Sequence, residues 1–130
     1  MLHRDYLLDI IEKFVEGVSA PLSRALLEGD LEAARDVESA VAGLLDLDPS
    51  IAMGLAPNSL VTMMLLSGVG DSVAAYVCYA LRRLAQAYQG AGEAALAELR
   101  SSQAQAIEES FAVEPGLVPA EFARLDVGLS

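Results

Sequence analysis

Apolar residues recur at three- and four-residue intervals along most of this 130-residue chain. This spacing places them on one face of an α-helix and leaves the other face to charged residues. In the first such segment the apolar positions are Tyr6, Leu7, Ile10, Ile11, Phe14, Val15 and Val18. Alternating β-branched runs, which would indicate strands, do not occur. The sequence therefore predicts an all-α fold.

Turn residues and capping residues divide the chain into about five helices. The first ends at Gly29, and its internal Pro21 either kinks the helix or makes it restart with Ser19 as an N-cap. Asp30 is suited to cap the second helix. Short connections between such helices predict antiparallel hairpins that pack into a bundle.

The domain organisation follows from length and from the distribution of proline and glycine. A chain of this length corresponds to about one domain. Two long helices are expected over residues 72–89 and 95–111, and Pro and Gly become frequent after them. We therefore expect a single helical domain over residues 1–112, with residues 113–130 forming a tail or a strap across the core.

Charge and composition exclude several classes of protein. The chain carries 19 Asp and Glu against 8 Lys and Arg, a net charge of -11, so nucleic acid and anionic membranes are unfavourable partners. A hydrophobic content of 54% is too high for an intrinsically disordered chain. The single cysteine excludes a disulfide scaffold, and no signal peptide is readable, so we expect a cytoplasmic protein.

Residues 49–70 contain no Asp, Glu, Lys or Arg. Proline and glycine interrupt this segment, which leaves a helix too short to span a membrane. A short helix starting at Pro57 or Asn58 has no charged face that water could solvate. We therefore interpret it as a buried plug or a contact surface. The candidate interface or pocket residues in and after this segment are Leu60, Met63, Met64, Leu66, Tyr76 and Tyr79.

Arg82 and Arg83 are the only charged residues of the helix expected over residues 72–89. The neighbouring helices are rich in acidic residues. We therefore predict that these two arginines lie against carboxylates of adjacent helices and orient their own helix.

No constellation of residues indicates catalysis, a cofactor or a metal. His3 lies too near the N-terminus to be held as a general base, and Cys78 is interpreted as a small buried hydrophobe. The Gly68 to Ser72 turn lacks the Lys and Ser or Thr of a phosphate-binding loop. Helix capping and solvated loops account for the acidic residues Glu28, Asp30, Glu32, Asp46 and Asp48.

Two segments resemble parts of tetratricopeptide repeats. Residues 29–35, followed by residues 45–49, resemble the second helix of the repeat, in which a proline ends the unit. Leu84, Tyr88 and Gly92, with Ala97 and Ala104, resemble its Leu, Tyr, Gly and Ala positions, although Ser101 stands where the repeat has a large aromatic residue. The resemblance implies helical hairpins packed on each other, as in an α-α superhelix.

Residues 5–111 also resemble a bacterial family of small helical proteins of unknown function. The match rests on Asp5, Tyr6, Leu7, Ile11 and Glu12 at the start, followed by the two repeat-like hairpins. Because that family has no assigned activity, the resemblance implies the fold only.

Two functional hypotheses remain. The first is a noncatalytic interaction module that binds a protein partner or forms a homodimer through the uncharged segment. The alternative is a small-molecule binder with an apolar pocket lined by Met63, Met64, Tyr76 and Tyr79. The sequence predicts no cofactor and favours a protein that is not an enzyme.

Overall fold

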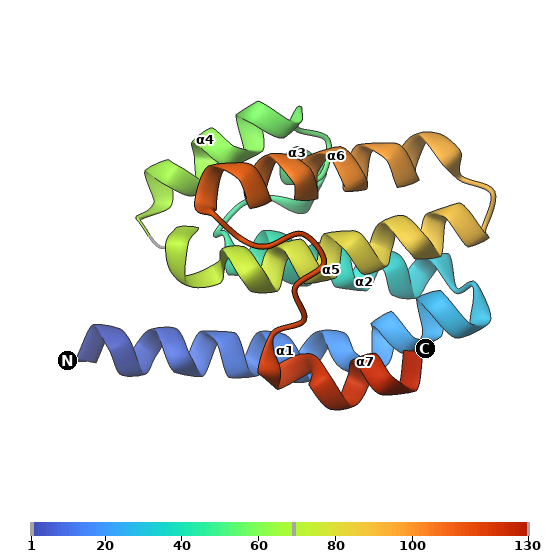
Figure 1. The fold of residues 1–130 in the computed structure, drawn as a ribbon, viewed down its shortest axis with the longest axis horizontal. Helices are drawn as coiled ribbons and strands as arrows, with labels where there is room; N and C mark the ends of the chain where they lie inside the picture. Colours follow the sequence, from blue (N-terminus) through green and yellow to red (C-terminus); the bar gives the residue numbers. More distant parts are fainter. Residues whose placement is uncertain (1, 69, 130) are drawn as a thin grey trace.

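The computed structural model describes residues 2–68 and 70–129, except for the side chains of residues 2–5. All regular secondary structure in this part of the chain is helical, and no strand occurs in it. This confirms the all-α prediction. Its elements are α1 (Leu2–Glu28), α2 (Leu31–Leu44), α3 (Pro49–Ala52), α4 (Pro57–Ser67), α5 (Gly70–Gly90), α6 (Ala94–Phe111), the short 3₁₀ helix η1 (Ala120–Phe122) and α7 (Ala123–Leu129) (Figure 1).

The described residues form seven α-helices rather than the five expected. The two additional helices, α3 and α7, are short, whereas α4 is the helix expected from Pro57 or Asn58. Pro49 and Pro57 each occupy the first turn of a helix, where the missing backbone N–H costs nothing. The uncharged segment therefore contributes two separate short helices, α3 and α4.

Helix α1 continues through Pro21 to Glu28 without restarting. The Ser19 hydroxyl donates a 2.6 Å hydrogen bond to the carbonyl oxygen of Val15, as expected inside a helix and not at an N-cap. Gly29 then turns the chain with a φ of 67°, a conformation that favours glycine. The restart with Ser19 as an N-cap is therefore wrong, and Pro21 lies inside one continuous helix.

Two antiparallel hairpins, α1 with α2 and α5 with α6, form the body of the protein (Figure 1). Helix α5 lies at the centre and contacts α1 and α2 on one side and α6 on the other, while α4 packs on α5 and α6. The described residues do not show tetratricopeptide-like repeats. The fully buried core contains, among others, Val18, Leu22, Leu60, Met64, Leu81, Leu84 and Ile107.

The segment after α6 crosses the bundle and places η1 and α7 against α1 (Figure 1). Phe122 inserts into the core with no exposed surface. Its ring stacks on Tyr79 at a centroid distance of 4.5 Å and meets Phe14 edge-on at 6.4 Å. Residues 113–129 therefore lie across the bundle as a strap, anchored by one aromatic side chain.

Across residues 2–68 and 70–129, none of the helices combines the length and the apolar character needed to cross a bilayer.

Candidate functional site

A groove of about 630 Å³ opens between the first part of α1, the end of α2 and the end of α4. We call it the end groove. Its lining is mostly apolar and comprises Tyr6, Leu7, Ile10, Gly43, Leu44, Leu45, Asp46, Leu47, Met63, Leu66, Ser67 and Val73. Among these described lining residues Asp46 is the only charged one.

Helix α4 presents one face to the core and the other to the surface. Leu60 and Met64, one turn apart, are completely buried. Met63 and Leu66 both line the end groove, and their exposed fractions are 38% and 77%. Leu65 is also exposed, at 60%. One face of α4 is therefore buried in the core, and the other is the exposed face on which the expected contact surface would lie.

The tyrosines of the candidate set lie elsewhere, around the strap. Tyr79 is buried against the Phe122 ring and lines a separate cavity of about 260 Å³. Tyr76 donates a 2.8 Å hydrogen bond to Glu121, just before Phe122. Met63 lines the end groove, whereas Met64 is enclosed by the core. The four residues of the hypothetical small-molecule pocket therefore do not share one cavity.

The prediction that Arg82 and Arg83 lie against carboxylates of adjacent helices is confirmed. Arg82 pairs with Glu108 of α6 through two hydrogen bonds, one of them 2.9 Å between its Nε and the Glu108 Oε2. Arg83 pairs with Asp126 of α7. The guanidinium of Arg83 holds the pKa of the Asp126 carboxyl below its usual value. These two pairs tie α5 to α6 and to the strap.

Cys78 is buried on α5, as the sequence interpretation required. Its sulfur lies 3.7 Å from the carbonyl oxygen of Ala104. Burial raises the pKa of the thiol to about 12, and the nearby Glu108 carboxylate adds to this effect. Such a thiol is almost entirely protonated at neutral pH and is therefore a poor nucleophile.

Two of the acidic candidates are helix caps, as predicted. Asp30 accepts hydrogen bonds from the backbone N–H groups of Glu32 and Ala33, and Asp48 accepts one of 2.9 Å from that of Ser50. The Ser50 hydroxyl also donates to Asp48 and lowers the pKa of this carboxyl.

Within the described residues, no group of three or more His, Cys, Asp or Glu side chains is placed to hold a metal ion. The side chain of His3 lies outside the described residues. Gly68 caps the end of α4 with a φ of 77°, and α5 begins at Gly70; Val69 lies outside the described residues.

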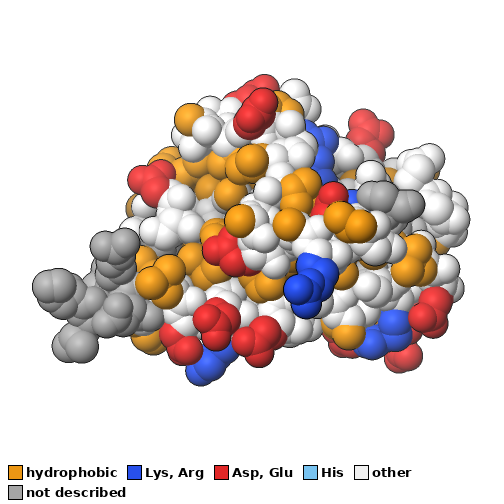
Figure 2. Space-filling model, turned by 60° about the horizontal axis from the view of Figure 1, so that its bottom comes forward, with side chains coloured by type: hydrophobic (Ala, Val, Ile, Leu, Met, Phe, Trp, Pro, Cys, Tyr) orange, Lys and Arg blue, Asp and Glu red, His pale blue; other side chains and the backbone are white. Residues whose placement is uncertain are grey.

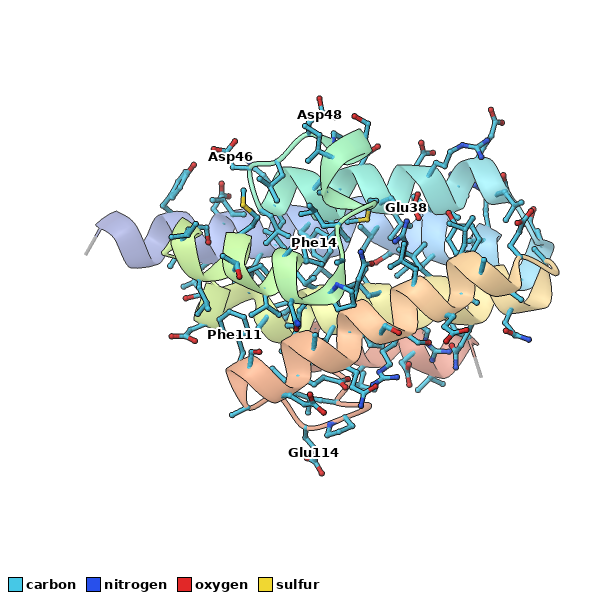
Figure 3. All side chains as sticks on the ribbon, turned by 90° about the horizontal axis from the view of Figure 1, so that it is seen from above. Phe14, Glu38, Asp46, Asp48, Phe111 and Glu114 are labelled. Atoms are coloured by element: carbon cyan, nitrogen blue, oxygen red, sulfur yellow. The ribbon has the colours of Figure 1, made fainter. Side chains whose placement is uncertain are left out.

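Sequence reasoning missed a buried polar network that joins α2, α5 and α6. Arg100 is 3% exposed and donates from Nε to the Glu38 Oε2 at 2.9 Å. It also donates at 2.7 Å to the carbonyl oxygen of Met53. Gln103 donates to the carbonyl oxygen of Leu55 at 2.9 Å and so fixes the link between α3 and α4. Figure 3 shows Glu38 pointing from α2 toward the interior, whereas Asp46 and Asp48 point outward.

The sequence contains one indication of this network. Arg100 stands between Ala97 and Ala104, on the apolar stripe of α6, and a charge on such a stripe indicates a buried partner. Among the described residues every fully buried side-chain nitrogen or oxygen has a hydrogen-bond partner. The network is thus a structural element that positions α4, and with it the end groove.

In comparisons with known proteins, no family model, no curated protein and no solved structure matches this chain.

Proposed function

We propose that this chain is a noncatalytic, cytoplasmic helical interaction module that binds a polypeptide through the end groove and the outer face of α4. The polypeptide is a protein partner or a second copy of the chain in a homodimer. The observation that supports this most directly is the exposure of Leu65 and Leu66, at 60% and 77%, beside an apolar groove. Contiguous exposed apolar side chains commonly mark interaction sites.

The extent of the apolar surface favours a polypeptide over a small molecule. A second hollow of about 250 Å³ continues from the end groove along α1 and α2, and shares Ile10, Gly43 and Leu44 with it. Leu65 is exposed beyond the lining of either hollow. A compact ligand in the end groove would leave this outer surface uncovered, whereas a polypeptide covers both.

The pairing of the polar side chains supports a noncatalytic role. The buried Arg100, Glu38 and Gln103 bond to one another and to backbone oxygens, and the Cys78 thiol is buried and protonated. A catalytic group has to reach a substrate with its reactive atom. None of these buried groups is directed at the end groove lining.

A photoreactive benzophenone side chain placed at Leu66 tests the proposal in living cells. The matched control carries the same group at Glu32. This residue is exposed in the first turn of α2, at the end of α2 that does not line the groove. We expect irradiation to join a polypeptide to the Leu66 variant and not to the control. A product of two chain masses identifies a homodimer, and a different mass identifies another partner. Equal yields of cross-linked product at both positions, or none at Leu66, would refute the interaction module.

A further inference from the structure

The lining of the end groove indicates the chemistry of its occupant. This inference rests on the function proposed above. We infer that the end groove binds an amphipathic helix of a basic partner protein. In this arrangement the apolar face of the partner helix packs on Met63 and Leu66, and a lysine or arginine next to that face pairs with Asp46.

The shape of the surface fits a helix laid along it. The end groove and the adjoining hollow form one depression that follows α1 and α2, because both are lined by Ile10, Gly43 and Leu44. A helix bound in a groove uses apolar side chains at positions i, i+3 or i+4, and i+7 as successive anchors. The flexible Met63 side chain adapts to such anchors more readily than a branched one.

Asp46 supplies the polar contact. It lies in the link between α2 and α3, at the edge of the groove, with its side chain exposed. Its carboxylate has no ion-pair or hydrogen-bond partner among the described residues, whereas the nearby Asp48 carboxylate is engaged by Ser50. Its φ of 58° is a left-handed conformation that Asp and Asn tolerate better than most residues. The unpaired carboxylate is therefore exposed at the groove, where a cationic side chain can reach it.

The charge of the whole protein favours a cationic occupant over a second copy. A second copy would bring another net charge of -11 and another Asp46 to the same surface. Acidic side chains also predominate over basic ones on the face seen in Figure 2. Lys13, the cation that lines the adjoining hollow, is already paired with Asp9 at 3.1 Å. The resulting field attracts a basic helix and repels an acidic one.

Three synthetic peptides separate groove binding from general charge attraction. The first is a helical peptide with leucines on one face and lysines on the other. The second replaces every lysine with glutamate, and the third keeps the lysine composition but scrambles the positions of the leucines. We would measure the dissociation constant of each, labelled with a fluorophore, by fluorescence anisotropy with the full-length protein.

We expect the basic amphipathic peptide to bind roughly tenfold more tightly than either of the other two. Leu66→Gln should weaken it by about tenfold, because the substitution removes an apolar anchor. Asp46→Asn, which keeps a residue that tolerates the left-handed conformation, should weaken it by roughly threefold through loss of one exposed charge pair. The matched control, Asp36→Asn, removes an exposed carboxylate on α2 that does not line the groove, and should leave the affinity unchanged.

The outcomes distinguish the partner class from the proposed function. If Leu66 cross-links to a polypeptide in cells but the acidic or scrambled peptide binds as well as the basic amphipathic one, the inference fails and the interaction module stands. A dimer in native mass spectrometry that Asp46→Asn strengthens would show that a second copy occupies the groove, and would also overturn the inference. If neither a cross-link nor peptide binding occurs, both proposals fail.

Discussion

The hydroxyl of Tyr88 in α5 donates a 2.8 Å hydrogen bond to the carboxylate of Glu38 in α2. The same Glu38 oxygen also accepts from Arg100 of α6, so one carboxylate joins three helices inside the bundle. Tyr88 and Arg100 are both almost fully buried. Such a network is costly to break because the group left behind stays out of water.

Removing one charge of this network should destabilise the protein strongly. We expect Arg100→Met to lower the free energy of unfolding by about 3 kcal/mol, because Glu38 then remains buried without its cation. The double variant Glu38→Leu with Arg100→Met should lose less than the sum of the two single variants, since it leaves no unpaired charge. Urea unfolding measures both, with the exposed Arg124→Met, on α7, as control. Additive losses would contradict a coupled pair.

Phe122 should anchor the strap. It is completely buried and packs on the rings of Phe14 and Tyr79. We expect Phe122→Ala to lower the free energy of unfolding by about 3 kcal/mol and to speed amide hydrogen exchange in residues 113–129 before the rest of the chain. Val127 is 78% exposed on the same strap, so Val127→Ala should change stability by less than about 0.5 kcal/mol. Unaltered exchange in the Phe122 variant would argue against the anchor.

Gly70 marks the closest approach between the start of α5 and its neighbours. A Cβ at this position would lie 2.8 Å from the Phe111 ring and 2.9 Å from the carbonyl oxygen of Met64. We expect Gly70→Ala to lower the melting temperature, with a loss of about 1 to 3 kcal/mol. Gly17→Ala is the matched control in α1, where no atom lies within 4 Å, and should raise stability by up to about 1 kcal/mol. Two variants of equal stability would refute this packing.

The two faces of α4 should respond differently to a charge. Met64→Glu introduces a carboxylate into the core, because this side chain has no exposed surface, and should cost about 3 kcal/mol or more. Leu66→Glu places the same carboxylate at a position that is 77% exposed, and the fold should tolerate it. Circular dichroism during thermal unfolding compares the two variants directly. Similar melting temperatures would mean that α4 is not oriented as described.

Alkaline pH should lower the free energy of unfolding. The loss should begin before tyrosines with ordinary pKa values are fully ionised. Burial raises the pKa of Cys78 from 9.0 to about 12 and that of Tyr76 from 10.0 to about 12, and it also raises the pKa values of Tyr79 and Tyr88. Above pH 9 the unfolded chain therefore releases protons that the folded chain retains. The free energy of unfolding should then fall as pH rises from about 9 toward 12.

Urea unfolding at a series of pH values measures this dependence, and tyrosinate absorbance reports ionisation in the same samples. Cys78→Ala should reduce the slope between pH 9 and 10, where its thiol is the first of these groups to ionise in the unfolded chain. For one fully buried group, the free energy of unfolding falls by at most about 1.4 kcal/mol per pH unit. Constant stability up to pH 12 would contradict the raised pKa values.

Local signals predicted the elements well, and the long-range partners poorly. The capping role of Asp30 and the helix start at Pro49 follow from bonds within three residues, which a sequence displays directly. Arg82 and Arg83 were predictable as partners of carboxylates, because they are the only charged residues over residues 72–89. Which carboxylates they meet was not predictable, since several acidic residues compete for this role.

The candidate site was only partly foreseen, for a related reason. The uncharged segment indicated a helix without a solvent-adapted face, and α4 is such a helix. The spacing of its apolar residues alone did not determine that Met64 enters the core while Leu66 stays exposed. Tyr76 and Tyr79 were grouped with this helix because they are near it in sequence, but in the structure both rings lie beside Phe122 of the strap.

Sequence by itself determined the helical class, the capping role of Asp30 and the excess of negative charge, because each depends on neighbouring residues or on residue counts. Tertiary structure alone decided which apolar face is covered and which charges meet. Glu38 and Arg100 are 62 residues apart in the sequence, and the ring centroids of Tyr76 in α5 and Phe122 in η1 lie 6.4 Å apart although α6 intervenes in the chain. Burial is a property of surfaces brought together by folding, so the exposed Leu66 and the open end groove become visible only once every other helix has taken its place.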